Sequence, residues 1–477
     1  MKYIIVIAIL SQMLVRSADA GRPNVILFLA DDISQEDLGC YGNESMQTPN
    51  IDRLAANGLR FDNAFLTISS CSPSRCSIIT GRYPHNTGAA ELHTTLPKGS
   101  VLFPEFLKDA GYYTVLSGKD HMGSEAHRGF TKVSKGVGPG KEGDWVEILH
   151  GRPKDQPFFF WFASTDAHRG WTLNDDAPQY SPEDVVVPPY LVDGPKTRED
   201  LTGYYHEVSR FDHYIGLVVE ELEQQGVLDQ TVIIVMADNG RPFPRCKTRL
   251  YDSGIKTPFI VHYPDGAVVG STESMISSID VAATVLDLAK IEKVERIQGI
   301  SFHSILSNSK ATTRDVVFAE HNWHVFRNHE RLVRTGDWLY IRNNLPEQQN
   351  LCVEAYMGGA GDELWDNQKL GTLSDAQQNV FWNPCPEEEL YHVSKDVHQL
   401  SNVASNPENK PVLETMRGLL SEWTEQTGDT LPENLSPDRE ARPGKPKKDR
   451  KNFSYGEMPG KAAGSEKINH PGPLHLQ

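Results

Sequence analysis

Three continuous apolar segments restrict most strongly what this chain can fold into. They are Asn24–Ala30 (NVILFLA), Phe158–Ala163 (FFFWFA) and residues 231–236 (TVIIVM). Strands that are apolar on both faces are typical of a parallel sheet covered by helices on each side. The sequence therefore predicts an α/β fold built on a doubly wound, mostly parallel sheet.

Weaker patterns in other parts of the chain support the same architecture. Residues 199–226 carry apolar side chains at alternating steps of four and three, which is the spacing of one helix face. Residues 103–110 and 278–288 show shorter helical patterns, and residues 112–116 and 259–263 are predicted strands. A chain of 477 residues is too long for one simple core, so we expect a large domain and a smaller one.

The sequence changes character near residue 320. Residues 331–342 alternate like an antiparallel strand. We expect the large domain over 21–325 and a smaller α+β subdomain, containing an antiparallel sheet, over 326–435. Residues 436–477 are rich in Pro, Gly and Lys and are predicted to be a disordered tail. Its basic run, 445–451, is interpreted as solvated, with contact to a polyanion as the alternative.

Residues 1–20 have the features of a secretory signal peptide. Lys2 precedes an apolar stretch, and Ala18 and Ala20 form a small-x-small cleavage pattern. The stretch is too short to span a bilayer, and no later segment is long enough. We expect an exported protein without a membrane span, in the periplasm or secreted, or in the lysosome of a eukaryote.

Charge and cysteine content narrow the possible partners. The net charge of −17 argues against nucleic-acid binding, and an anionic substrate would need a local basic pocket. Cysteines can pair in an oxidising compartment. Cys352 and Cys385 are the expected pair, because both lie in the same late segment.

Polar side chains gather where the predicted strands end. They are Asp31, Asp32, Lys119, His121, His168, Asp238, Asn239 and, just ahead of a strand, Lys247. In an open doubly wound sheet, ligands bind in the crevice at the carboxyl ends of the strands. One crevice can therefore hold all eight side chains.

Four of these residues offer only oxygen ligands. Adjacent carboxylates such as Asp31 and Asp32 repel each other unless a cation or hydrogen-bond donors separate them. With Asp238 and Asn239 they favour Ca²⁺ or Mg²⁺ over zinc. A helix cap beside a solvated acid is the alternative interpretation of the first pair.

Cys71 begins the segment CSPSR (71–75), which predicts the start of a helix. Pro73 suits a first helical turn, and Gly81 can end the helix. Cys71 would then lie at the positive end of the helix, where anions bind, and Arg75 could hold its side chain. A buried cysteine before an ordinary helix is the alternative.

The CSPSR segment, followed by Gly81-Arg82 and accompanied by the strand-end residues, resembles the signature of type I sulfatases, of the alkaline-phosphatase-like superfamily. The resemblance covers roughly residues 24–402. It implies that Cys71 is oxidised to formylglycine (3-oxoalanine) by a formylglycine-generating or anaerobic sulfatase-maturing enzyme. An oxygen of this residue would complete a calcium site, and the substrate would be a sulfated carbohydrate.

The resemblance also implies roles for the remaining residues. The hydrated aldehyde at residue 71 attacks sulfur, with Asp238 as proton acceptor. His168 protonates the leaving group, and His121 accepts a proton from the second hydroxyl of the hydrate. A serine at residue 71 lacks that hydroxyl and would trap the sulfated intermediate. The cations that neutralise the developing charge are Lys119, Lys247 and Arg75.

Within the family, GKDHMG (118–123), DAHR (166–169) and DNGRPFP (238–244) resemble the sulfamidase-like (N-sulfoglucosamine sulfohydrolase) members, which have an arginine in place of Lys247. The C-terminal half is less similar. An O-sulfated polysaccharide such as ulvan or a glycosaminoglycan therefore fits, and so does an N-sulfated sugar. Candidate sugar-binding residues are His93, Arg169, His321, His324 and Arg327.

Two further functions stay open. A phosphodiesterase or phosphonate hydrolase of the same superfamily could use the same nucleophile. A catalytically inactive carbohydrate-binding protein would result if Cys71 is never modified.

Overall fold

The structure of the chain is a computed structural model that describes residues 21–264, 268–356, 358–442 and 453–476. The predicted signal peptide over 1–20 and the basic run over 445–451 lie outside these residues. Within the described ranges, no helix is long and apolar enough to cross a membrane.

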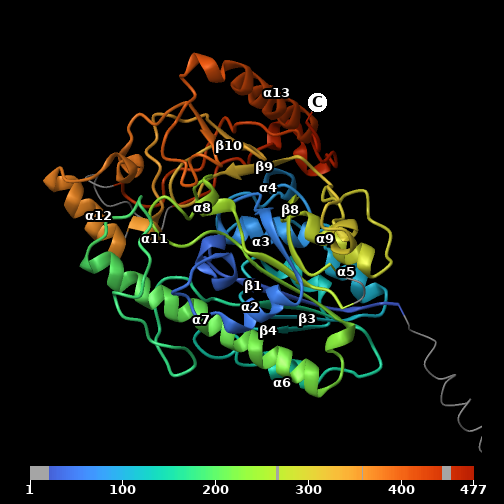
Figure 1. Cartoon of the computed structure of the whole chain (residues 1–477). Helices are drawn as coiled ribbons and strands as arrows, with labels where there is room; N and C mark the ends of the chain where they lie inside the picture. Colours follow the sequence, from blue (N-terminus) through green and yellow to red (C-terminus); the bar gives the residue numbers. More distant parts are fainter. Residues whose placement is uncertain (1–20, 265–267, 357, 443–452, 477) are drawn as a thin grey trace, which may run out of the picture.

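An eight-stranded sheet lies at the centre of the molecule, with helices on both faces (Figure 1). In spatial order its strands are β4 (Lys132–Ser134), β3 (Tyr113–Gly118), β5 (Phe158–Ala163), β1 (Asn24–Ala30), β6 (Thr231–Ala237), β7 (Phe259–His262), β2 (Leu59–Phe65) and β8 (Gly270–Ser277). The pairings are parallel except for the two that β7 makes. The three apolar segments are the neighbouring strands β5, β1 and β6, so the prediction of a doubly wound, mostly parallel sheet is confirmed.

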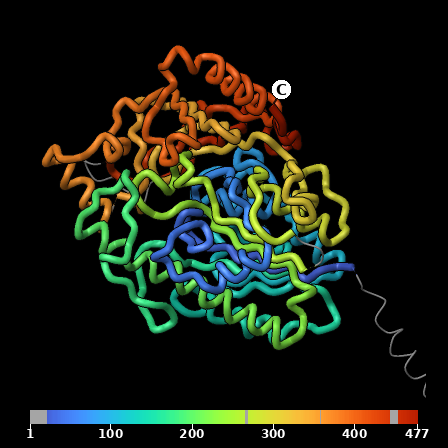
Figure 2. The backbone as a smooth tube through the Cα atoms, viewed as in Figure 1, coloured from blue at the N-terminus to red at the C-terminus, as the bar shows by residue number. Residues whose placement is uncertain are grey.

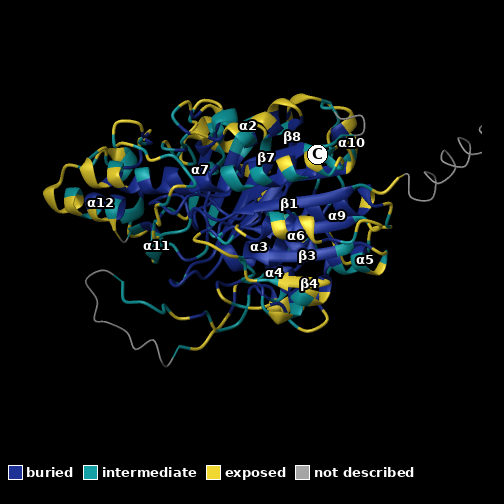
Figure 3. Ribbon diagram, turned by 90° about the horizontal axis from the view of Figure 1, so that it is seen from below, coloured by how far each residue is buried: buried dark blue, intermediate teal, exposed yellow. Residues whose placement is uncertain are grey.

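Alternate side chains of β1 enter cores on opposite faces of this sheet. Val25 and Leu27 pack on the side of α3 (Cys71–Thr80), α5 (Phe103–Asp109) and α9 (Asp280–Leu288). Ile26 and Phe28 pack on the side of α2 (Pro49–Ala56), α6 (Trp145–His150) and α7 (Pro195–Gln224). Figure 3 shows these buried strands between the two helical layers. Continuous apolar strands are required here because helices cover both faces.

A second, antiparallel sheet of four strands forms the smaller subdomain. Its spatial order is β12 (Glu388–His392), β11 (Trp338–Asn343), β10 (Glu330–Thr335) and β9 (Val316–His321). One face packs on α13 (Lys410–Thr427), where the rings of Phe318 and Trp423 stack 5.2 Å apart. The C-terminal third, orange to red, lies together at one side of the large sheet (Figure 2). The structure also has the short helices α4 (Pro84–Thr87), α8 (Asp252–Ile255), α10 (His303–Ser307) and α11 (Val353–Tyr356), and the longer helix α12 (Gly359–Leu370).

Two predictions about this subdomain are corrected. The predicted boundary after residue 325 divides the small sheet, because β9 already starts at Val316. Residues 331–342 form most of a hairpin rather than one strand, since β10 and β11 are separate antiparallel neighbours. Residues 336 and 337, a Gly-Asp pair, make the turn between them.

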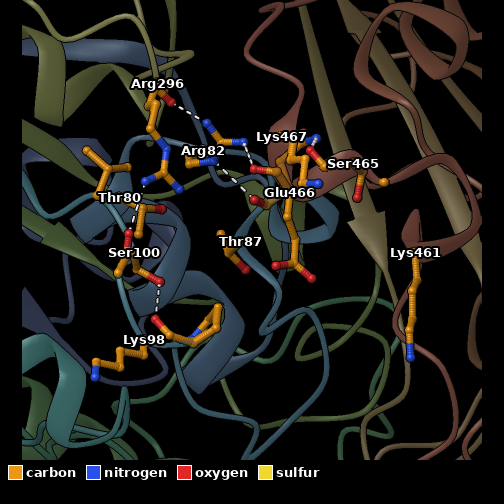
Figure 4. Close-up of a pocket in the computed structure, with 15 residues that line it drawn as sticks. Thr80, Arg82, Thr87, Lys98, Ser100, Arg296, Lys461, Ser465, Glu466 and Lys467 are labelled. Carbon is orange, nitrogen blue, oxygen red and sulfur yellow. Dashed lines mark hydrogen bonds between the residues drawn. The ribbon is translucent and has the colours of Figure 1, made fainter.

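The prediction of a disordered tail over 436–477 is wrong for the residues that the structure describes. Arg82, just after α3, donates to the main-chain oxygen of Glu466 at 3.1 Å (Figure 4). It also donates to the main-chain oxygen of Ile468 at 2.8 Å. The Asp315 amide donates to the Leu474 oxygen at 2.7 Å. A segment with few apolar residues is ordered here because its main-chain carbonyls are bound by a buried arginine, which composition does not reveal. It borders a cavity of about 280 Å³ at this end of α3.

The predicted Cys352–Cys385 disulfide is also wrong, since all cysteines in the described residues are free thiols. The Cys352 thiol donates to Glu354 Oε2 at 3.1 Å. The Cys385 Sγ lies 3.4 Å from the carbonyl oxygens of Gln348 and Trp382. Each thiol therefore has acceptors of its own.

Candidate active site

Cys71 is the first residue of α3 and is almost completely buried. The helix ends as predicted at Gly81, which adopts a left-handed φ of +64°. The Cys71 Sγ lies 3.7 Å from Asp31 Oδ1 and 3.9 Å from Asp32 Oδ1. The side chain therefore lies between the N-terminus of α3, with its positive dipole end, and the carboxyl end of β1.

The four predicted metal ligands meet at the ends of two paired strands. Asp31 and Asp32 follow β1, Asp238 and Asn239 follow β6, and these strands are parallel neighbours. The Asp32 amide donates to Asp238 Oδ1 at 3.3 Å, and Asn239 Nδ2 donates to Asp32 Oδ1 at 2.5 Å. The parallel register thus places two sequence-distant pairs beside Cys71.

Each carboxylate of this group has a cationic partner. Lys119 contacts Asp31, Lys247 Nζ lies 2.8 Å from Asp32 Oδ2, and Arg75 Nε lies 2.7 Å from Asp238 Oδ2. The Lys247 and Arg75 side chains are fully buried. The site therefore carries three cations next to Cys71, which is the local basic pocket that an acidic chain needs to bind an anion.

The residues present fit a hard divalent cation. Burial raises the pKa of both Asp32 and Asp238, and a bound cation would offset this cost of keeping the two buried carboxylates charged. The Asn239 Oδ1 is buried and has no hydrogen-bond partner among the described residues. An orphaned amide oxygen beside three carboxylates is the donor set of a calcium or magnesium site.

Histidines lie next to this cluster on separate loops. Lys247, and then burial, lowers the pKa of His168 to about 4. His121 Nε2 lies 2.7 Å from His93 Nδ1, and burial lowers the pKa of both rings. The His93 amide donates to Ser72 Oγ at 2.7 Å, so His93 is tied to α3. The imidazoles are therefore neutral proton acceptors until an anion binds beside them.

Three of the predicted residues have a strained backbone. Asp32, His93 and His121 have φ angles of 61°, 65° and 59°. The left-handed region is uncommon for residues other than glycine and costs of order 1 kcal/mol or more, and such residues cluster at functional sites.

Three candidate sugar-binding residues contact other parts of the chain. Arg169 makes a two-pronged ion pair with Asp200 and donates to the Pro242 oxygen, so it joins α7 to the loop after β6. His321 Nδ1 lies 2.7 Å from Glu330 Oε2 between paired strands of the small sheet. Arg327 is directed at the Ser436 main chain.

No sequence motif points to Glu354, which the structure places at the cluster. Glu354 Oε1 lies 3.8 Å from Lys247 Nζ, and its Oε2 lies 3.2 Å from His324 Nε2. His324 Nδ1 in turn lies 2.7 Å from Ser70 Oγ, one residue before Cys71. Both ring nitrogens of the candidate His324 therefore have partners beside Cys71, whereas Glu354 lies in a segment without a recognisable motif.

This arrangement has the parts needed to hydrolyse an anionic ester. A reactive side-chain position at a helix N-terminus faces a cation site, fixed ammonium and guanidinium groups surround it, and neutral imidazoles lie within reach. Preorganised positive charge of this kind usually provides the largest part of the stabilisation of an anionic transition state.

Comparison with known proteins agrees with this geometry. A family model described as Sulfatase matches residues 23–140 and 144–291, and one described as N-sulphoglucosamine sulphohydrolase, C-terminal, matches residues 246–346. Human N-sulphoglucosamine sulphohydrolase is 31% identical over 497 aligned residues, covering 89% of this chain and 96% of the human protein. An ulvan-active sulfatase of Formosa agariphila is 29% identical, covering 87% of this chain and 77% of that protein.

A solved structure has the same fold. It is of a protein in complex with its substrate D-glucosamine-2-N,6-O-disulfate, with a TM-score of 0.65 and 21% identity. The match covers 85% of this chain and 98% of that one.

Proposed function

This chain belongs to the sulfatase family, whose members hydrolyse sulfuric esters, and we propose that it removes sulfate from a sulfated saccharide through an aldehyde made from Cys71. The placement of Cys71 carries the proposal. Cys71 lies at the N-terminus of α3, and its Sγ lies within 4 Å of the carboxylates of Asp31 and Asp32. Relatives named for ulvan and for N-sulphoglucosamine support a saccharide as substrate.

The cation would be held by Asp31, Asp32, Asp238 and Asn239 together with an oxygen of the modified residue 71. Calcium suits this shell best because it accepts more oxygen ligands than magnesium. The cation and the aldehyde hydrate would supply charge neutralisation and the attacking oxygen.

The side chains around residue 71 bind and orient the sulfate group. Lys119, Lys247 and Arg75 would neutralise its oxygens, and the buried position of Lys247 and Arg75 strengthens each interaction. An anion bound there raises the pKa of His168, which can then donate a proton to the leaving group. His121, held by His93, is the candidate acceptor for the proton that must leave residue 71.

Hydrolysis of an N-linked sulfate is the second candidate activity. The match of residues 246–346 to the C-terminal model named for N-sulphoglucosamine sulphohydrolase favours it. We also propose that the chain is exported, as residues 1–20 suggest, and that a formylglycine-generating or anaerobic maturing enzyme acts on it.

Mass spectrometry of the Cys71 peptide, after co-production with a formylglycine-generating enzyme, tests the nucleophile. The expected result is the mass of an aldehyde or its hydrate in place of the thiol. Hydrolysis of O-sulfated and N-sulfated oligosaccharides by the modified protein then separates the two activities. Faster turnover of aryl phosphodiesters than of any sulfate would instead identify a phosphodiesterase, and an unmodified Cys71 with saccharide binding would identify an inactive binding protein.

A further inference from the structure

A second group of metal-ligating side chains lies beside the catalytic cluster. It consists of His324, in the loop after β9, and of Cys352 and Glu354 at the start of α11. One ligand atom of each lies within 4.8 Å of the others. We propose that these three residues bind zinc or a similar thiophilic divalent cation.

The distances within the group are those of ligands that surround one small ion. Glu354 Oε2 lies 3.1 Å from Cys352 Sγ and 3.2 Å from His324 Nε2. His324 and Cys352 are buried, so water has little access to their ligand atoms. Three protein ligands leave a fourth tetrahedral position for water or for a substrate atom.

The donor atoms separate this site from the one beside Cys71. One nitrogen, one sulfur and one carboxylate oxygen suit zinc, whereas a thiolate does not suit calcium or magnesium. The four ligands around Asp31 offer only oxygen. The chain therefore offers separate sites to a hard cation and to a borderline cation.

Hydrogen bonds around the ligands prepare the site for binding. The Cys352 thiol donates a hydrogen bond to Glu354 Oε2, so its sulfur already faces the second ligand. A cation would displace the thiol proton, so one proton is released for each ion bound. Ser70 Oγ, 2.7 Å from His324 Nδ1, can accept the ring N–H, which leaves the Nε2 lone pair for the metal.

The charges balance although Lys247 is close. Lys247 Nζ lies 3.8 Å from Glu354 Oε1, while Oε2 faces the other two ligands. Asp32 lies closer to this ammonium, at 2.8 Å, and neutralises it. A thiolate and a carboxylate then match a divalent cation. Through Glu354 and Ser70, the proposed site contacts the sulfate-binding lysine and the start of α3.

Cobalt titration of the full, calcium-loaded protein, with residue 71 converted to its aldehyde, tests the proposal. Cobalt bound to a thiolate gives a charge-transfer absorption band that a site with only oxygen ligands cannot produce. We expect one equivalent of Co²⁺ to give this band, Zn²⁺ to abolish it, and Cys352→Ser to remove it. Cys352→Ser should lower the affinity for Co²⁺ by more than the roughly 10–100-fold that loss of an outer-sphere partner costs. Ser70→Ala removes such an outer-sphere partner, so a loss of about 10–100-fold is expected for that variant.

Cys385→Ser is the matched control, because Cys385 is another buried thiol of the same subdomain with only main-chain contacts. It should bind cobalt like the parent protein. Calorimetry of the unmutated protein in two buffers should also show release of one proton per zinc. An absorption band that persists in Cys352→Ser, or no band and no proton release in the parent protein, overturns the proposal whether or not the variant folds.

Discussion

The crevice of the large sheet and the small C-terminal subdomain both contribute to the site, but by different means. In the crevice, Asp31, Asp32, Asp238 and Asn239 each directly follow a strand, and the parallel register alone brings them together. From the subdomain side, His324 lies on a loop and Glu354 on the short helix α11, and only tertiary packing positions them. The strand-end residues of the crevice are thus held in one arrangement by the sheet, whereas the residues that the subdomain contributes can change without disturbing the sheet.

Loss of the residue-71 nucleophile should have the largest effect. Cys71→Ser keeps the size of the side chain but cannot form a hydrated aldehyde, so kcat should fall by on the order of 10³-fold or more. At most one turnover is expected, with sulfate left covalently attached at residue 71, which intact mass spectrometry would detect. Cys76→Ser, at a buried thiol of the same helix, is the control and should retain turnover. Sustained turnover by the residue-71 variant would show that another group is the nucleophile.

Replacement of the lysine that faces both regions should have the next largest effect. Lys247 is fully buried between Asp32 and Glu354, and Lys247→Ala removes one charge that would face the sulfate oxygens. A loss of about 10²–10³-fold in kcat/KM is expected, as for the removal of one donor to a developing anion. Steady-state kinetics on a small aryl sulfate measures it.

Lys247→Arg is the matched variant, because sulfamidase-like members of the family are expected to have arginine at this position. It should recover most of the activity. If both variants lose equally, the side chain at this position acts through packing rather than through its charge.

The same contrast explains which parts of the fold and of the site could be predicted from the sequence. The strands, the helix that begins at Cys71 and the strand-end ligands follow from local patterns of apolar and polar residues. The start of the small sheet at Val316, the contact of Glu354 with Lys247 and the free thiols of Cys352 and Cys385 depend on which distant segments pack together. Low apolar content predicted disorder after residue 436, but order there comes from main-chain hydrogen bonds to Arg82, which composition does not encode.

Arg82 tests the importance of that docking for stability. Its buried guanidinium donates to the Asn86 oxygen at 3.0 Å and to the Ile468 oxygen at 2.8 Å. It therefore links the segment after α3 to the C-terminal segment. Arg82→Ala leaves these buried acceptors unpaired, so a loss of about 3 kcal/mol of unfolding free energy is expected. Chemical denaturation measures it, and hydrogen exchange should rise over 464–470. Arg296→Ala is the control, since the Arg296 side chain donates to the Gly99 oxygen at an exposed contact. An equal loss of unfolding free energy in Arg296→Ala would contradict the special role of Arg82.

The smallest effect concerns a carboxyl group where the two regions meet. Glu91 is buried and accepts a hydrogen bond from Ser436, and burial raises the pKa of Glu91 to about 7. Because the unfolded chain binds fewer protons at this group, its stabilising contribution is complete below pH 4.5 and is lost as the pH rises through 7. Glu91→Gln removes this titration, so its unfolding free energy should fall less between pH 5 and pH 8, by up to about 3 kcal/mol. Ser436→Ala keeps the carboxyl group and should keep the pH dependence. Parallel pH profiles for Glu91→Gln and the parent protein would mean that Glu91 is already ionised in the folded state, and that the segment at Ser436 does not bury it.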